Sequence, residues 1–463
     1  MTISQAHLSI SDPDASLTDR WTDIFRRDPL VHLGLMASIV AATFQGYLKD
    51  RIPGALPYAL SDGFLIGAIA LWFAGMAIRR EPFRGPGRST ALLLIITVVP
   101  TLYLLHPGTP LLIKLAGLRA WIEFPVVCLT ALTVVRTTGQ VRAYVGLILV
   151  LCALTAAYGI WQYNAGPQAV LSIGNLAELR HGGSVFYVLP GTLQLRFRAI
   201  STFNFPAPFA MMMVFGTLLA AGVLASRLKR PAVRLLLLGL IPVMFLGMTV
   251  SGTRAAMIIL MAGVGVIAWY RRLTAGQVAL GVVLLLAMYL ASLATAGTAI
   301  TRFQSAFLQE GLLWIYLLGP VTVAARALGE TLIGHGLGRT GVGVPFAIAQ
   351  GQSADYFIFS DGDVGRAAVE MGLVGILLVL FIVFGFLPYA WRAARALLGT
   401  DSEDVGLGIV ALLTATGLGV LIGSPFAAAP HGTMWWFLLG ALLKLGTMAD
   451  DQRRDEGRGT SDE

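Results

Sequence analysis

The side chains with the clearest capacity for chemistry are arginines that stand beside apolar, membrane-like stretches. Arg196 and Arg198 lie in RFRAISTFNFPAPF, directly before an apolar stretch, and Arg254 lies in TVSGTRAAM between two others. A guanidinium is a planar fork of N–H donors that matches phosphate oxygens. Ionisable groups near a membrane are costly and usually face a cavity. The pattern favours a site for a lipid diphosphate, and the alternative is anchoring of these arginines to lipid headgroups.

The turn before Arg254 is expected to add to this positive charge. Ser251, Gly252 and Thr253 predict a tight turn, and a Ser or Thr side chain is expected to cap the helix that follows. Free N–H groups and a partial positive charge gather at such a helix start. Arg254 would add a full charge at the same place.

The segment after Arg198 is expected to hold its side chain above a membrane helix. Residues 202–204 are predicted to be extended, with Asn204 as a cap. Pro206 biases Phe205 away from the helical conformation and suits a helix start, where its missing N–H costs little.

An acidic stretch, DYFIFSDGDVGRAAVEMGLVGILLVL at 355–380, supplies candidates for acid–base chemistry. Asp361 at the edge of an apolar helix is a candidate general base. Arg366 and Glu370 are four residues apart, so they share a helix face. The alternative is a solvated loop followed by a charge pair that the helix dipole favours.

A lone histidine, His335, stands among glycines in LIGHGLGRTG, and Arg339 follows it. The glycines predict turns, and their GxGxxG-like spacing is not followed by a dinucleotide-binding unit. No spacing of His, Cys, Asp or Glu residues is typical of a metal site. We therefore expect neither a metal nor a cofactor.

The composition requires these groups to lie in or on a bilayer. The 463 residues are 56% hydrophobic and 13% charged, whereas soluble domains have roughly 45–50% apolar and about 25% charged residues. We interpret the net charge of +8 as a membrane-topology signal, not as a nucleic-acid surface. Cys128 and Cys152 lie in apolar runs and are expected to be buried and unlinked.

The predicted fold class is an all-α polytopic membrane protein with about twelve transmembrane helices. A single transmembrane domain, 29–448, is expected between cytoplasmic tails at 1–28 and 449–463. The first tail lacks the pattern of a cleavable signal. The predicted spans are 30–48, 59–78, 90–106, 117–135, 143–163, 205–225, 233–250, 254–270, 276–295, 366–388, 405–423 and 431–447.

The distribution of basic residues predicts the orientation. Every predicted inner loop is basic, which places both termini in the cytoplasm by the positive-inside rule. The outer side has two long connections, 164–204 and 296–365, and long loops are usually functional. The second connection, between the ninth and tenth helices, contains the apolar stretch 311–328, which is predicted to form a short helix on the membrane or in a cavity.

Taken in order, these stretches resemble the membrane superfamily of O-antigen ligases and of O-antigen or exopolysaccharide polymerases. The arginine and T-F-N-P-x-x-F-A pattern of that family is similar to 198–210, and its S-R-G-A-like turn to 251–255. Its glycine-rich loop piece is similar to 332–338, and its E-x-G-x-x-G helix to 370–375. The resemblance covers roughly residues 195–380.

One departure from the family pattern selects a branch. Ligases of this family place His-Asn where this chain has Asp361 and Gly362. The polymerase-like branch often has an aspartate there and an arginine further along the helix. Asp361 and Arg366 resemble that variant. The resemblance therefore favours a polymerase and makes a ligase the alternative.

The resemblance implies a metal-independent, inverting glycosyl transfer on the outer face of the inner membrane. The donor would be an oligosaccharide on undecaprenyl diphosphate. The acceptor would be another lipid-linked repeat unit for a polymerase, or a lipid A core for a ligase. A chain-length regulator is the expected protein partner.

The implied roles follow from the residue types. Arg198 and Arg254 would take the leaving diphosphate, and Asp361 would orient or deprotonate the acceptor hydroxyl. Further candidates for substrate contact are Arg196, Arg366, Asn204, Arg339, His335 and Glu370. A secondary transporter is the alternative of another class, although the sequence shows no pair of related halves, and a non-catalytic scaffold is the third.

Overall fold

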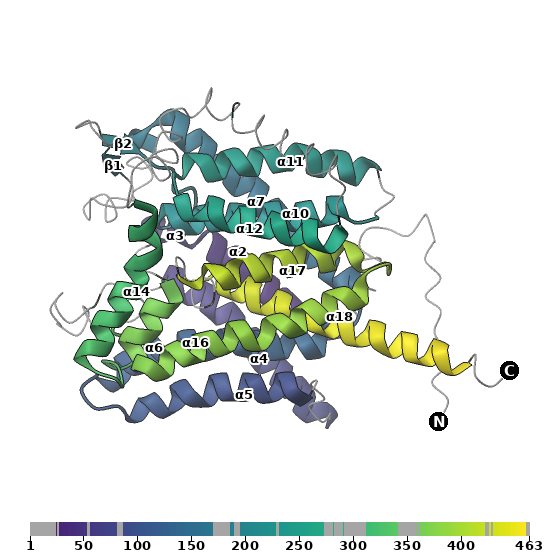
Figure 1. Cartoon of the computed structure of the whole chain (residues 1–463), viewed down its shortest axis with the longest axis horizontal. Coiled ribbons are helices and arrows are strands. Elements are labelled where there is room, and N and C mark those ends of the chain that lie inside the picture. Colours follow the sequence, from purple (N-terminus) through teal and green to yellow (C-terminus); the bar gives the residue numbers. More distant parts are fainter. Residues whose placement is uncertain are drawn as a thin grey trace.

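A computed structural model shows a stack of long helices that run side by side, from α11 at one edge to α5 at the other (Figure 1). The structure describes residues 25, 27–52, 56–80, 87–169, 186–188, 195–227, 231–272, 281, 290, 312–340, 358, 362–421, 426 and 429–459.

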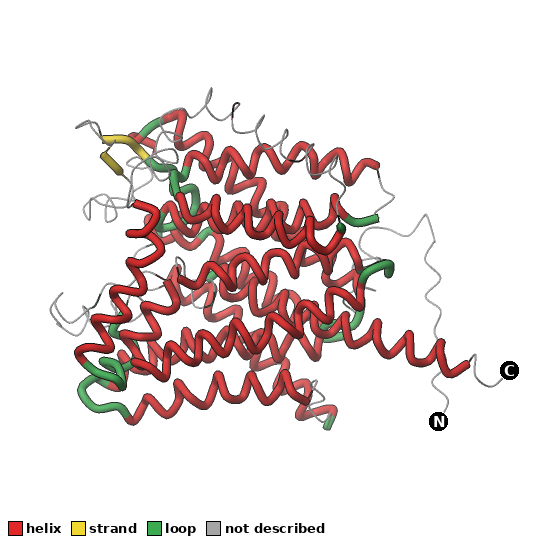
Figure 2. Tube along the Cα trace, viewed as in Figure 1, coloured by secondary structure: helices red, strands yellow, loops and turns green. Residues whose placement is uncertain are grey.

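Helices dominate the described residues, with one small hairpin (Figure 2). The first helices are α2 (Pro29–Thr43), α3 (Gln45–Arg51), α4 (Leu56–Arg79), α5 (Gly87–Leu102), α6 (Leu111–Val134) and α7 (Thr138–Ala165). The later helices are α10 (Pro206–Ala225), α11 (Pro231–Val250), α12 (Arg254–Arg271), α14 (Leu312–Glu330), α16 (Gly362–Leu397), α17 (Glu403–Leu418) and α18 (His431–Gly459). Strands β1 (Phe186–Val188) and β2 (Leu195–Phe197) pair antiparallel.

Seven helices among the described residues are long and apolar enough to cross a membrane. They lie within α4, α6, α7, α10, α11, α12 and α16. Shorter apolar helices at Pro29–Thr43 and Thr90–Leu105 accompany them. The chain is thus a helical, membrane-embedded protein. The total of about twelve spans stays a prediction, and the ninth, 276–295, lies outside the described residues except for 281 and 290.

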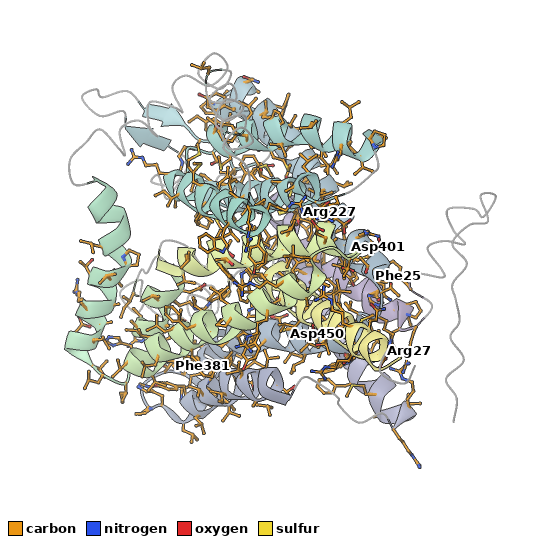
Figure 3. All side chains as sticks on the ribbon, turned by 45° about the vertical axis from the view of Figure 1, so that its right-hand side comes forward. Phe25, Arg27, Arg227, Phe381, Asp401 and Asp450 are labelled. Carbon is orange, nitrogen blue, oxygen red and sulfur yellow. The ribbon has the colours of Figure 1, made fainter. Side chains whose placement is uncertain are left out.

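The two ends of the stack differ in composition. We call the end at which α18 finishes the terminal end, and the end with β1, β2, α3 and α14 the hairpin end (Figure 1). Ion pairs join the predicted inner loops at the terminal end: Arg79–Asp28 at 2.8 Å, Arg142–Asp404 at 2.8 Å and Arg271–Glu403 at 2.5 Å. Arg27, Arg227 and Asp401 also lie there (Figure 3).

The centre of the stack is formed by α10, α17 and α18. Side chains such as Phe215, Trp435 and Trp436 are almost fully buried there. At the crossing of α10 and α17, a Cβ on Gly222 would lie 2.2 Å from the Cα of Gly408. Small residues let membrane helices approach closely and gain van der Waals contact. Both cysteines are free and buried, as predicted.

The segment 198–204 is tied to several helices at the hairpin end. The hydroxyl of Thr202 donates to the carbonyl of Thr43 at the end of α2 (2.7 Å). Gln162 of α7 accepts from the backbone N–H of Ser201 (2.8 Å) and donates to its carbonyl (3.1 Å). These bonds fix the chain directly after Arg198 of the predicted phosphate site.

Gly46 of α3 packs directly against this segment. A Cβ at Gly46 would lie 2.4 Å from the carbonyl carbon of Phe203 and 2.6 Å from the carbonyl oxygen of Thr202. Both are backbone atoms, so Gly46→Ala must displace the segment. We expect a loss of about 1–3 kcal/mol, measured as a lower melting temperature in detergent.

Gly67→Ala on α4 is the matched control, because an added methyl group meets nothing within 4 Å there. Alanine also favours a helix over glycine. Equal melting temperatures of the two variants would contradict the packing of α3 on the segment.

Candidate functional site

Arg198 is bound to the turn between α11 and α12. Its Nε donates to the carbonyl of Ser251 (2.8 Å), and an Nη2 donates to Oγ1 of Thr253 (3.0 Å). Arg254, which is half-buried, is the next residue and the first of α12. Two arginines therefore lie at one turn and at one helix N-terminus, at the hairpin end.

The predicted hydroxyl cap of α12 is wrong. Thr253 is the N-cap residue, but its side chain makes no capping hydrogen bond within the described part of that helix. Its hydroxyl instead accepts from Arg198. The Ser251 hydroxyl donates to the carbonyl of Met248 (2.6 Å) and accepts from the N–H of Thr253 (3.2 Å). The long-range bond to the arginine replaces the local cap.

The segment after Arg198 also differs from its prediction. Residues 202–204 are not extended, because the N–H of Phe203 donates to the carbonyl of Ile200 (3.1 Å) and closes a turn. The N-cap of α10 is Phe205, not Asn204. Pro206 does begin the helix, and Phe205 is extended, as predicted.

A second polar cluster lies at the start of α16 and centres on Glu370, which is fully buried. Its Oε2 accepts from Nε1 of Trp121 (2.7 Å), and its Oε1 accepts from Oγ1 of Thr340 (2.5 Å). Arg366 lies 3.5 Å from the same carboxylate. The guanidinium carbon of Arg366 is 5.0 Å from the centroid of the Trp121 ring. The predicted shared face of Arg366 and Glu370 is thus an interior ion pair.

Several buried polar atoms have no hydrogen-bond partner within the described part of the chain. They include Nε and Nη2 of Arg366, Oδ1 of Asn204 and Nε2 of His431. Buried polar groups are nearly always hydrogen-bonded, so an orphaned atom of this kind is a pointer to a functional site. Arg366 and Asn204 are among the residues predicted from the sequence.

His431 and its neighbours connect the two clusters. The rings of Phe203 and His431 stack with centroids 6.2 Å apart. Five residues earlier, the N–H of Phe426 donates to Oδ2 of Asp363 in the first turn of α16 (3.0 Å). His431 was not among the residues predicted from the sequence. Its only signal was a polar residue at the edge of the last apolar span.

A kink in α16 brings the glycine-rich loop to Glu370. Gly372 has φ 62° and ψ −140° inside the helix, a conformation that essentially only glycine adopts. The freed carbonyls of Val369 and Glu370 accept from the N–H groups of His335 (2.8 Å) and Gly336 (3.1 Å). The loop glycines make turns, as predicted. The N–H groups of the loop hydrogen-bond helix carbonyls for which lipid offers no donor.

Close packing at this kink excludes side chains. A Cβ at Gly338 would lie 2.3 Å from the carbonyl oxygen of Ile113 in α6. Next to the kink, the carbonyl of Met371 accepts from the hydroxyl of Tyr103 (2.8 Å). The glycine-rich loop, α6 and α16 therefore form one rigid corner at the hairpin end.

Two other predicted contacts, His335 and Arg339, lie in this loop. His335 Nε2 is 3.2 Å from a carboxylate oxygen of Glu330 in α14, and Arg339 Nε donates to the carbonyl of His335 (3.4 Å). Arg196 lies in β2 opposite Tyr187, but its side chain is outside the described residues, as is the whole of Asp361. Their roles stay predictions.

An ion-pair network within the helices was missed. Arg119 of α6 contacts Asp62 of α4 (2.7 Å) and Glu123 one turn further along (2.9 Å). A signal existed in the sequence, because Arg119 and Glu123 are four residues apart in an apolar stretch. Intramembrane ionisable residues are rare and usually functional.

Comparisons with known proteins add little. No protein-family model and no curated protein matches the chain. A solved structure described as "Structural coordination of polymerization and crosslinking by a peptidoglycan synthase complex" contains a similar chain with a TM-score of 0.39 and 15% identity. The match covers 78% of this chain and 95% of that chain. The likeness is weak, and no conclusion is drawn from it.

Replacing Glu370 by glutamine tests the buried pair. Glu370→Gln would leave the Arg366 guanidinium buried without its counter-charge, and breaking such a pair costs about 3–5 kcal/mol. We expect a large drop in melting temperature. Arg326→Gln is the control, because the Arg326 side chain is 85% exposed in its pair with Glu330 and exposed pairs contribute about 0–1 kcal/mol. Equal effects would show that the buried pair contributes no more than the exposed one.

Replacing Gly372 by alanine tests the kink. A Cβ there would lie 2.1 Å from the carbonyl oxygen of Leu332, and the backbone conformation disfavours any side chain. We expect Gly372→Ala to lower the melting temperature strongly, by loss of roughly 1–3 kcal/mol or more. Gly385→Ala on the same helix should be tolerated, since its nearest neighbours are side-chain atoms at 3.7 Å. A stable Gly372→Ala protein would refute the kink.

Proposed function

We propose that this protein is a membrane glycosyltransferase that takes its glycan from a lipid diphosphate at the hairpin end. The observation that carries the proposal is the bonding of Arg198 to Ser251 and Thr253, at 2.8 and 3.0 Å, beside Arg254. Two guanidiniums and a helix N-terminus at one turn suit a phosphate group.

The chemistry explains why this charge must be fixed in place. The acceptor hydroxyl oxygen attacks the anomeric carbon, and the bond between sugar and phosphate breaks on the opposite face. Negative charge then develops on the leaving diphosphate. Donors that are already oriented stabilise this charge without reorganisation. The bonds that hold Arg198 and residues 201–202 supply this preorganisation.

The start of α16 serves the acceptor in this proposal. Asp361 takes the proton of the acceptor hydroxyl or orients it. Arg366, fixed between Glu370 and the Trp121 ring, offers its buried Nη2 to the acceptor or to Asp361. Glu370 acts as a positioning residue, because its carboxylate is already engaged by Trp121 and Thr340.

The finer assignment is an O-antigen or exopolysaccharide polymerase. Its donor is an oligosaccharide on undecaprenyl diphosphate, and its acceptor is a second lipid-linked unit. It acts on the outer face of the inner membrane with a chain-length regulator as partner. Asp361 and Gly362 in place of His-Asn support this branch. A ligase, with lipid A core as acceptor, is the alternative within the same chemistry.

A secondary transporter is the candidate of another class, and two observations favour it. Arg119, Asp62 and Glu123 form a charged network inside the helices, and α16 is broken at Gly372. Broken helices and intramembrane charges are typical of transporters. Purified protein in liposomes separates the two classes. New glycosidic bonds support the enzyme, and glycolipid movement without them supports the transporter.

Arg254→Ala is the sharpest test of the phosphate site. Loss of a preorganised donor typically lowers turnover by about 10²–10³, so we expect shortened or absent polymer in cells with confirmed expression. Arg254→Lys should restore little, because lysine lacks the bidentate fork. Arg272→Ala, at the other end of α12, is the control. Normal polymer from Arg254→Ala would remove Arg254 from the mechanism.

A further inference from the structure

Three charged side chains, which we call the Arg119 cluster, meet between α4 and α6. Arg119 donates from Nη2 to Oδ1 of Asp62 (2.7 Å) and from Nε to Oε2 of Glu123 (2.9 Å). Both helices are long and apolar enough to cross a membrane. Glu123 stands twelve residues after Leu111 and eleven before Val134, the two ends of α6. At about 1.5 Å per residue, this is roughly 16–18 Å from either end of the helix.

The charges of the cluster do not balance. Besides its bond from Arg119, Oδ1 of Asp62 accepts from the hydroxyl of Ser61 (3.5 Å). No other polar contact of the three side chains occurs within the described part of the chain. Lys114, the other cation of α6, donates to the carbonyl of Leu104 instead (2.8 Å). Two carboxylates therefore share one guanidinium, and two negative charges with one positive charge leave −1.

The titratable side chains on the neighbouring helices contact other residues. Glu370 and Arg366 of α16 meet α6 at Trp121, which is on the opposite face of the helix from Arg119 and Glu123. The side chains of α5 from Thr90 to Leu102 include no titratable group. Further contacts of this kind are His32 of α2 with Tyr144, Arg51 of α3 with Tyr47, Tyr103 of η1 with Met371, and His431 of α18 with Phe203.

One oxygen of Glu123 is buried and has no donor. Its Oε1 makes no hydrogen bond within the described residues, and the side chain is 5% exposed. The Asp62 and Arg119 side chains are 16% and 35% exposed. Water can therefore reach the edge of the cluster, whereas no larger ligand can touch Oε1.

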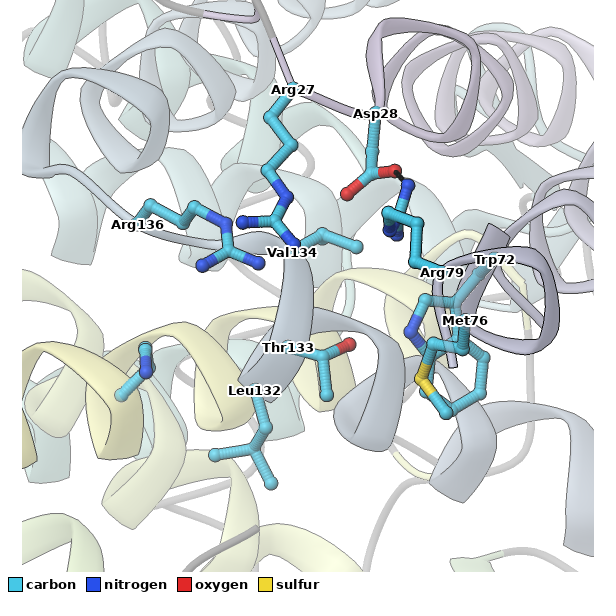
Figure 4. Close-up of a pocket in the computed structure, with 10 residues that line it drawn as sticks. Arg27, Asp28, Trp72, Met76, Arg79, Leu132, Thr133, Val134 and Arg136 are labelled. Atoms are coloured by element: carbon cyan, nitrogen blue, oxygen red, sulfur yellow. Dashed lines mark hydrogen bonds and ion pairs between the residues drawn. The ribbon is translucent and has the colours of Figure 1, made fainter. Parts of the chain in front are cut away.

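The pair of Asp28 and Arg79 shows a different arrangement at the terminal end. Oδ1 of Asp28 accepts from Nη1 of Arg79 (2.8 Å), as the dashed line in Figure 4 shows. Both residues line a cavity of about 350 Å³, and one water molecule occupies about 30 Å³. Solvent can stabilise the charge of Asp28, but it cannot do so for the buried oxygen of Glu123.

The physical cost of the unbalanced charge indicates the ligand. An unpaired carboxylate inside a bilayer is expensive, and such groups find a partner or become neutral. A metal ion needs several ligands, and the described residues contain no group of three or more His, Cys, Asp or Glu side chains that could hold one. A proton needs one oxygen and no space beyond it. The cluster therefore fits a proton.

We propose that Oε1 of Glu123 binds one exchangeable proton, which makes the Arg119 cluster neutral. Water at the exposed edge of Arg119 and Asp62 supplies the proton, and its uptake changes the charge of the cluster from −1 to 0. Oε2 keeps its bond from Arg119 in both states. The site does not depend on the proposed transferase activity.

Infrared spectroscopy of the full chain in detergent, at neutral pH, tests the proposal. A protonated carboxylic acid has a C=O stretching band apart from those of carboxylates and amides. We expect this band in the unaltered protein and its loss in Glu123→Gln, equal to one carboxyl group per chain. The band should shift only slowly after transfer to heavy water, because Oε1 is buried. Identical spectra of the two proteins would overturn the proposal.

A second variant tests the charge count and decides the matter if Glu123→Gln does not fold. In Asp62→Asn, Arg119 and Glu123 balance each other, so Glu123 releases its proton and the band is lost. A band that persists in Asp62→Asn contradicts the charge argument. Asp28→Asn is the matched control and should leave the band unchanged, because its carboxylate lines a cavity that holds water.

Two further measurements identify the oxygen and the ion. Asp62→Glu should leave the position of the band unchanged, since the proton is on Glu123. A shifted band in this variant places the proton on residue 62 and overturns the assignment. Sodium chloride at high concentration should also leave the band unchanged, because Oε1 offers no space for a metal ion. Loss of the band with sodium, but not with an equal concentration of choline chloride, overturns the choice of a proton.

Discussion

The donation of Arg198 to the turn before α12 is the interaction on which the hairpin end depends. It ties β2 to the α11–α12 corner with one charged side chain. The residues that follow are held by α2 through Thr43 and by α7 through Gln162. These bonds come from α2, α7 and the turn between α11 and α12. The position of the arginine is therefore determined by these four helices together.

The hairpin end also supplies hydrogen-bond partners at the point where α16 is interrupted, which would otherwise be costly in a bilayer. The kink at Gly372 frees carbonyl groups, and lipid offers them no donor. The glycine-rich loop supplies backbone N–H groups, and Glu370 binds the loop back through Gly338 and Thr340. The kink and the loop are therefore one structural unit, and Trp121 of α6 joins it by donating to Glu370.

Charge is arranged differently at the two ends. At the hairpin end the arginines of the candidate site are held by side-chain contacts, as for Arg366 over Trp121. At the terminal end ion pairs join the loops, as for Arg142 and Asp404.

Local patterns in the chain were enough for a helical, membrane-embedded fold, because apolar runs and prolines act over a few residues: Pro206 starts α10 and the loop glycines make turns. They failed for the cap at Thr253, where a long-range bond from Arg198 replaced the local one. They also failed for the segment 202–204, which closes a turn onto Ile200 and is held by Thr43. The Glu370 cluster and the contact of His431 with Phe203 join residues more than a hundred positions apart. Such contacts depend on packing in three dimensions, because no periodicity along the chain predicts them.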